Sequence, residues 1–202
     1  MLIILEKRNK DLATNKDNKM HDVFCILYRA SCIPFKEIMV REIENVFAKL
    51  SGYRCFGCDP TNDSGLKLKI FADDEKAEVF ARIETEDRLS GFPGILHGGI
   101  QCVLIDEVAF WAMFDRIKKI GVTVKVEMEF LNTVRTSSHI EVRGKIDRIE
   151  GQDVFIAVDI LNEKNEVCTR GRVVYHIAKK ETIFKILGKE IFTPEFLKYL
   201  EG

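Results

Sequence analysis

Apolar and polar residues alternate along six segments of the chain, and a period of two is typical of strands that bury one face. The segments lie near residues 66–70, 77–83, 122–131, 138–149, 153–162 and 166–177. Asp73-Asp74 separates the first two, and short polar turns separate the last three. Strands with such short connections pair antiparallel, so the pattern predicts one antiparallel sheet.

Two other segments have apolar residues at helical spacing. Residues 34–50 predict an amphipathic helix that ends at Ser51-Gly52. A second helix is predicted from Gly98-Gly99 to about Lys119, and it is apolar on nearly every face. A sheet with one apolar face needs a cover, and only this helix is apolar enough to supply it. The predicted fold class is α+β, with a curved antiparallel sheet of about six strands wrapped around one long buried helix.

The chain is long enough for one domain with extensions. We expect an N-terminal extension with the amphipathic helix over residues 1–50, one sheet-and-helix domain over residues 51–179, and a C-terminal helical extension over residues 180–202. The last segment is too apolar for a solvated tail. Either extension could cap a pocket or add to a subunit interface.

Charge and hydropathy exclude several classes of function. Lysine and arginine number 31 against 32 acidic residues, so the basic excess needed for nucleic-acid or membrane-surface binding is absent. No apolar run approaches the ~20 residues of a membrane span, and the N-terminus does not fit a signal peptide. We expect a cytoplasmic protein whose six scattered cysteines are reduced.

The central helix carries two acids among apolar residues. Asp106 shares its face with Cys102, Phe110 and other non-polar residues, and Glu107 is nearly as apolar in its surroundings. Such a carboxylate is either a hydrogen-bonded structural group or part of a site. Gly98-Gly99 favours the site, because a glycine helix start offers unpaired N–H groups that a substrate oxygen can approach closely. A helix end that stabilises an oxyanion, followed two turns later by a carboxylate, suits acyl transfer.

In these residues the chain resembles the hotdog-fold acyl-CoA thioesterases, specifically their phenylacetic-acid-pathway-like branch. The resemblance covers about residues 53–177 and rests on four motifs. These are Gly94 to Gly99, Leu104 to Glu107, the strand Thr123 to Leu131, and Cys55 to Asn62 with the following Gly65 to Leu68. It implies a hotdog fold and a homodimer or a dimer of dimers. The implied reaction is hydrolysis of an acyl-CoA thioester to a free acid and CoA, without a cofactor.

The resemblance also implies roles for single residues. Asp106 corresponds to the catalytic carboxylate, and the backbone N–H around Gly98 to the group that polarises the thioester carbonyl. Thr123 matches a hydroxyl that helps to hold the water and is donated across the dimer interface. Whether Asp106 attacks directly or activates water stays open. Asn132-Thr133 stands where the family commonly has Arg-Pro, which weakens inferences about contacts at that point.

Other candidates have structural alternatives. His97 is a catalytic candidate, but its favoured role is to support the loop before the helix through a side-chain hydrogen bond. Gly99, Glu107 and Phe110 are substrate-binding candidates, although Glu107 could equally pair with a group of the partner subunit and Phe110 could be core. Candidates for the CoA phosphates are Lys118, Lys119, Arg135, Arg170 and Arg172, which the sequence does not rank.

Cys55 and Cys58 form a Cys-x-x-Cys pair that invites a zinc or redox interpretation. A structural zinc site needs four ligands, and no second Cys/His pair stands at a suitable spacing. A redox pair prefers a helix N-terminus, whereas this pair enters a polar loop. We therefore expect a tight turn packed near the site, and no metal.

Two rival functions remain. A non-catalytic acyl-CoA or lipid-binding hotdog module would use the same fold, although a pure binder has little reason to bury an acid. A hotdog enoyl-CoA hydratase or dehydratase would need a catalytic histidine, and His97 in a Gly-Gly turn fits that role poorly.

Overall fold

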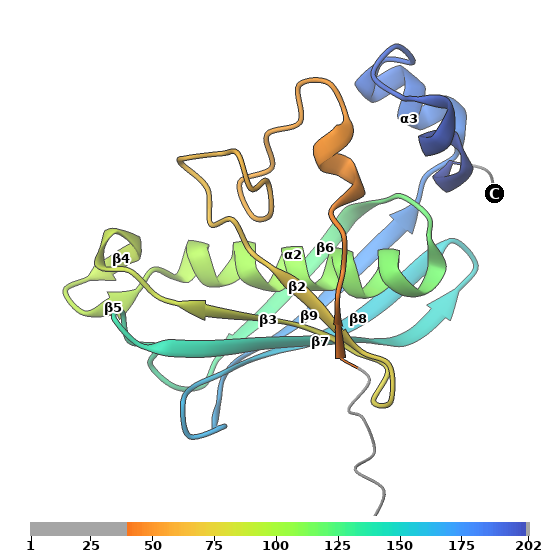
Figure 1. The fold of residues 1–202 in the computed structure, drawn as a ribbon. Coiled ribbons are helices and arrows are strands. Elements are labelled where there is room, and N and C mark those ends of the chain that lie inside the picture. The colour runs from red at the N-terminus through yellow and green to blue at the C-terminus, as the bar shows by residue number, and fades with distance from the viewer. Residues whose placement is uncertain (1–39, 201–202) are drawn as a thin grey trace, which may run out of the picture. The chain divides into compact units, whose positions relative to one another are not determined.

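The computed structural model describes residues 40–200, which form a seven-stranded antiparallel sheet, one long helix packed against it, and the segments that connect and extend them (Figure 1). The sheet has the order β1-β2-β3-β7-β8-β9-β6. Its strands are β1 (Val40–Glu42), β2 (Ile70–Asp73), β3 (Glu78–Glu84), β6 (Gly121–Phe130), β7 (His139–Glu150), β8 (Asp153–Leu161) and β9 (Val167–Ile177). A separate hairpin pairs β4 (Ser90–Phe92) with β5 (Ile95–Leu96). The predicted hotdog architecture, an antiparallel sheet around one buried helix, is confirmed.

The central helix α2 (Gly98–Ile117) runs along one face of the sheet, as Figure 1 shows. Its residues Leu104, Ile105 and Val108 are 0% exposed, because the inward-facing side chains of the strands enclose them. Glycine at the sheet allows this close approach: a Cβ on Gly171 would lie 2.5 Å from Cγ2 of Ile105. Lys118 ends the helix in the left-handed conformation, with φ of 58°.

The prediction of a helix over residues 34–50 is wrong for residues 40–50, the part of this range that the structure describes. Val40–Glu42 is strand β1, which pairs with β2 in the register Glu42 to Phe71, and only a short 3₁₀ helix (Val46–Lys49) follows it. The side chain of Asn45 accepts hydrogen bonds from the N–H groups of Phe47 and Ala48 and starts this short helix. Pairing with the open edge of β2 outweighs the helical spacing. Residues 34–39 lie outside the described part.

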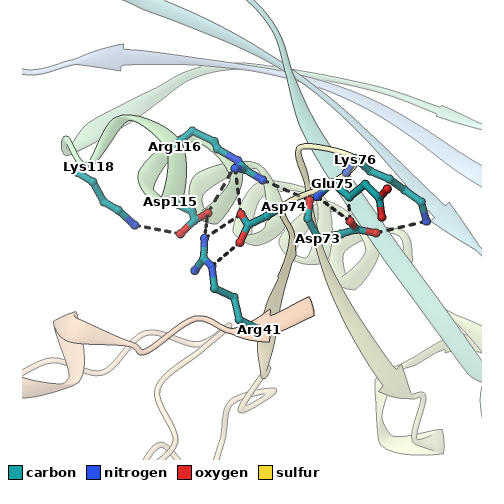
Figure 2. Close-up of polar contacts among 8 residues, drawn as sticks. All are labelled: Arg41, Asp73, Asp74, Glu75, Lys76, Asp115, Arg116 and Lys118. Carbon is teal, nitrogen blue, oxygen red and sulfur yellow. Dashed lines mark hydrogen bonds and ion pairs between the residues drawn. The ribbon is translucent and has the colours of Figure 1, made fainter. Parts of the chain in front are cut away.

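A salt-bridge cluster joins β1 to the C-terminal turn of α2 (Figure 2). Arg41 donates from Nη2 to Oδ2 of Asp115 at 2.7 Å and from Nε to Oδ2 of Asp74 at 2.9 Å. Lys118 donates to Oδ1 of Asp115 at 3.0 Å. Burial would raise the pKa of Asp115, whose side chain is fully buried, but the bonds from Arg41 and Lys118 outweigh it and lower that pKa. The cluster therefore fixes the first strand to the helix through charged groups.

The C-terminal segment forms the helix α3 (Lys180–Leu187) and a 3₁₀ helix (Pro194–Tyr199). Ile183 and Phe196 are buried, and the ring of Phe196 lies 5.3 Å from that of Phe47. The ring of Phe47 also lies 4.8 Å from that of Phe114 of α2, in a tilted arrangement, so the C-terminal segment extends the hydrophobic core. No helix among residues 40–200 has the length and apolar character needed to cross a membrane.

Candidate active site

A cavity of about 510 Å³ opens at the N-terminus of α2. The hairpin β4–β5 contributes Phe92, and the start of the helix contributes His97, Gly98 and Gln101. The end of β6 and the residues after it close the cavity with Phe130 and Asn132, among others. The lining is mostly apolar, so an apolar group can enter beside the unpaired N–H groups of a helix start.

His97 caps this helix through its side chain. Its Nδ1 accepts a hydrogen bond from the N–H of Gly99 at 2.8 Å, and its own N–H donates to the carbonyl of Leu89 at 2.9 Å. The N–H of Gly98 makes no hydrogen bond to any described residue. The favoured supporting role of His97 thus has a concrete geometry, and Gly98, not Gly99, keeps a free donor toward the cavity.

Two hydroxyl groups hold the carboxylate of Asp106. Thr123 donates from Oγ1 to Oδ1 at 2.9 Å, and the Tyr175 hydroxyl lies 2.7 Å from the same oxygen and 2.9 Å from the Asp106 carbonyl. Oδ2 receives no hydrogen bond from the part of the chain that is described. Asp106 is half-buried, and the two hydroxyls reach it from strands outside the apolar helix face that the sequence shows around it. One oxygen is tethered and the other is available to a water or a substrate.

Thr123 and Tyr175 reach Asp106 from the two outermost strands at one side of the sheet, β6 and β9, which pair through Thr123 and Tyr175 themselves. Thr123 was expected to act across a dimer interface, but its hydroxyl contacts Asp106 of its own chain. No motif in the sequence singles out Tyr175. Only the alternation of inward and outward residues along the last strand, which places Tyr175 on the inward face, points to a contact with the helix. Burial raises the pKa of Tyr175, with the charge of Asp106 adding to the effect, so its hydroxyl keeps its proton and donates.

Gly98 and Asp106 do not meet within one chain. They are eight residues apart on the same helix, which corresponds to about 12 Å along its axis at 1.5 Å per residue. A donor to a thioester oxygen and a base beside the same carbonyl carbon must each lie about 3 Å from the reacting atoms. A single copy therefore presents the two halves of the predicted site separately.

Glu107 and Phe110 lie away from the cavity at the helix start. The carboxylate of Glu107 accepts a hydrogen bond from Nε1 of Trp111 at 2.9 Å and faces Sγ of Cys55 at 3.3 Å, so its partners belong to its own chain. Burial, with Cys55 adding to it, raises the pKa of Glu107 to about 8. The ring of Phe110 lies 6.0 Å from that of Tyr175. The positions of Glu107 and Phe110 therefore do not support the prediction that these two residues contact the substrate directly.

Among the basic candidates, Arg135 lies beside the cavity, since it forms an isolated bridge with Ile95 and follows the lining residue Val134. Arg170 instead pairs with Asp159 at 2.9 Å on the neighbouring strand. Lys118 belongs to the cluster around Asp115 (Figure 2). The sequence could not make this distinction, because it depends on which loop meets the hairpin β4–β5.

Comparison with known proteins agrees with the fold and with the central motif. Residues 93–169 match the sequence model of the thioesterase superfamily. A solved structure of a thioesterase superfamily protein has a TM-score of 0.58 at 17% identity and covers 81% of each chain. Zebrafish thioesterase superfamily member 2 has a TM-score of 0.52 at 21% identity, over 60% of this chain and 87% of that chain. A thioesterase of Haemophilus influenzae has a TM-score of 0.50 at 23% identity, over 55% and 78%.

Identities this low establish likeness of fold alone. No curated protein is similar enough in sequence to be matched. The similarity in sequence to the thioesterase superfamily is therefore limited to residues 93–169, the segment that contains Gly98 and Asp106.

Proposed function

We propose that this protein, a hotdog-fold member of the thioesterase superfamily by its residues 93–169, hydrolyses an acyl-CoA thioester to a free acid and CoA. The observation that carries the proposal is the Asp106 carboxylate, with Oδ1 tethered by two hydroxyls and Oδ2 without a partner among the described residues. A binding module would gain nothing from a carboxylate held in this way.

The chemistry suits so sparse a site. Oδ2 of Asp106 accepts a proton from water as the water oxygen bonds to the thioester carbonyl carbon. Alternatively, Oδ2 bonds to that carbon itself, and water hydrolyses the resulting anhydride after CoA has left, which releases the acid and restores the carboxylate. The carbonyl oxygen gains negative charge, which the N–H of Gly98 and the positive end of α2 stabilise. The C–S bond then breaks and CoA leaves as a thiolate, which needs no strong general acid because thiol pKa values are about 8.5.

A complete site requires two copies of the chain. Strand β6 is at the edge of the sheet, and its residues are mostly exposed, with Val124 56% exposed. If two β6 edges pair antiparallel about a two-fold axis, the N-terminal end of one strand faces the C-terminal end of the other. Asp106 lies beside Thr123 at the first end, and Gly98 lies beside Phe130 at the second. The carboxylate of one copy then meets the oxyanion donor of its partner.

The test is release of free thiol from short, medium, long and aryl acyl-CoAs by wild type and by Asp106→Asn. Asparagine still accepts the bonds from Thr123 and Tyr175, so the variant should fold like the wild type in circular dichroism and thermal unfolding. We expect kcat/KM to fall by about 10²–10⁴-fold, the usual contribution of a general base. A folded variant that retains hydrolysis refutes the role of Asp106.

The same assay separates the rival functions. Acyl-CoA binding without thiol release by the wild type would indicate a binding module. Hydration of an enoyl-CoA without thiol release would indicate a hydratase.

A further inference from the structure

The Cys-x-x-Cys loop has a third potential ligand that lies far from it in the sequence. Sγ of Cys55, Sγ of Cys58 and a carboxylate oxygen of Glu107 lie within 4.8 Å of one another. Glu107 comes from α2, 52 positions after Cys55, and its side chain points away from the cavity. Cys58 is buried, while Cys55 and Glu107 are half-buried.

The carboxylate is oriented toward the two sulfurs. Nε1 of Trp111 holds Oε1 of Glu107 at 2.9 Å, which leaves Oε2 facing Sγ of Cys55 at 3.3 Å. The loop closes over this oxygen at Gly57, where a Cβ would lie only 2.2 Å from Oε2, so any larger residue would displace the carboxylate. A sulfur and an oxygen bound tetrahedrally to one zinc ion lie about 3.5 Å apart, given Zn–S near 2.3 Å and Zn–O near 2.0 Å.

Two polar side chains lie within hydrogen-bond distance of the Cys58 sulfur. The Tyr53 hydroxyl lies 3.0 Å from Sγ of Cys58, and Nδ2 of Asn45 lies 3.4 Å from the same sulfur. Hydrogen bonds of this kind orient metal ligands and stabilise the negative charge of a thiolate. They come from the segment before the loop, so the arrangement draws on three separate parts of the chain.

From this geometry we propose that Cys55, Cys58 and Glu107 bind one zinc-class divalent ion, with a water or another small ligand in the fourth position. Two thiolates select a borderline-soft ion such as Zn²⁺ over Mg²⁺ or Ca²⁺, which prefer oxygen ligands alone. The ion binds the thiolate and carboxylate forms of these ligands, so its uptake depends on pH. The ion ties the loop to the turn of α2 that also carries Asp106, from the side away from the cavity.

The experiment measures metal uptake by the full chain without substrate, so its outcome is independent of the proposed hydrolysis. Metal-free protein is titrated with Co²⁺, and sulfur-to-cobalt charge-transfer absorption and bound metal per chain are recorded. The variants are Cys55→Ser, Cys58→Ser and Glu107→Gln. The control is Cys102→Ser, which removes a half-buried thiol elsewhere on α2.

We expect one ion per chain and a thiolate absorption band in the wild type and in Cys102→Ser. Both should be lost in Cys55→Ser and Cys58→Ser. Glu107→Gln keeps an acceptor for Trp111, so it should fold, and its affinity should fall about tenfold or more because a charged ligand is gone. Zn²⁺ should raise the unfolding temperature of the wild type and leave that of Cys55→Ser unchanged.

Two results overturn the proposal. One is the absence of a thiolate band in the reduced wild type. The other is metal uptake that Cys55→Ser and Glu107→Gln leave intact while both variants remain folded. If Cys58→Ser alone fails to fold, the other two variants still decide.

Discussion

The two oxygens of the Asp106 carboxylate have different surroundings, and this asymmetry is the basis of the proposed chemistry. Thr123 and Tyr175 both donate to Oδ1, so the plane of the carboxylate is set from two strands. Oδ2 is thereby directed to one position, which a flexible side chain would occupy only part of the time. Positioning of this kind contributes to rate because reacting groups need not search for their geometry.

Tyr175→Phe tests this positioning, because it removes only the hydroxyl group that donates to Oδ1 of Asp106. A hydrogen bond to a charged group contributes about 1.5–3 kcal/mol, so kcat should fall about 10- to 100-fold at 1.36 kcal/mol per decade while KM changes little. Steady-state kinetics with Thr123→Ala and the double variant complete a cycle. We expect the two effects to be non-additive, because both hydroxyls act on Oδ1. An unchanged kcat in Tyr175→Phe, alongside an inactive Asp106→Asn, would remove Tyr175 from the mechanism.

At the scale of elements, the short strand β1 shows how a charged cluster secures a sheet edge. Strand β1 has only three residues, so it makes few backbone hydrogen bonds to β2, and all three residues are exposed. Arg41 compensates by reaching Asp74 after β2 and the buried Asp115 on α2 (Figure 2). The pKa of Asp115 is lowered in the folded chain, so its charge stabilises the fold above the unfolded pKa, about 3.9.

Arg41→Ala should lower the free energy of unfolding at pH 7 by about 1.5–3 kcal/mol, because the buried carboxylate loses a charged donor. The difference from wild type should shrink as the pH falls below the unfolded pKa of about 3.9 and through the lowered folded pKa of Asp115, where the carboxylate takes up a proton. Denaturant unfolding at several pH values measures this. Lys49→Ala is the matched control, since its pair with Glu44 is exposed on both sides and its loss should change stability little. Equal losses in the two variants would contradict the proposed importance of burial.

For the whole molecule, the separation of Gly98 from Asp106 means that the proposed reaction would need two copies of the chain. Gly98 is the first residue of α2, where proline is well tolerated and simply removes the N–H group. Gly98→Pro therefore deletes the oxyanion donor with little expected change in the helix. Asp106→Asn deletes the base and leaves the donor in place.

Mixing the two inactive variants provides the sharpest test of a shared site. Random reassortment of equal amounts gives half mixed dimers, each with one intact site of two, so about a quarter of the wild-type activity should return. Thiol release is measured after co-refolding, with mass in solution compared with the 23.2 kDa of one chain. Each variant refolded alone is the control. Failure to regain activity from demonstrated mixed dimers would show that Gly98 and Asp106 do not serve a common site across subunits.

The sequence by itself determined the order of the main elements and the first half of the site. Alternation with a period of two records which face of a strand is buried, so five of the seven sheet strands and the helix α2 could be predicted from local patterns. The strand predicted over residues 66–70 is misplaced, because β2 begins only at Ile70 and continues to Asp73. An acid in an apolar helix after two glycines likewise marked Asp106 and Gly98. These signals are local, because each depends on residues within a few positions of one another.

Only the tertiary structure decided which distant residues meet. Tyr175 reaches Asp106 across 69 positions, and Glu107 reaches Cys55 across 52. Strand β1 likewise exists because β2 offers it an open edge. Such contacts follow from the way the sheet wraps α2 and brings its strands to particular turns of the helix. Sequence spacing carries no measure of that distance. For this reason Asp106 was predictable as a candidate site residue, while its contact with Tyr175 and the meeting of Glu107 with the two cysteines were not.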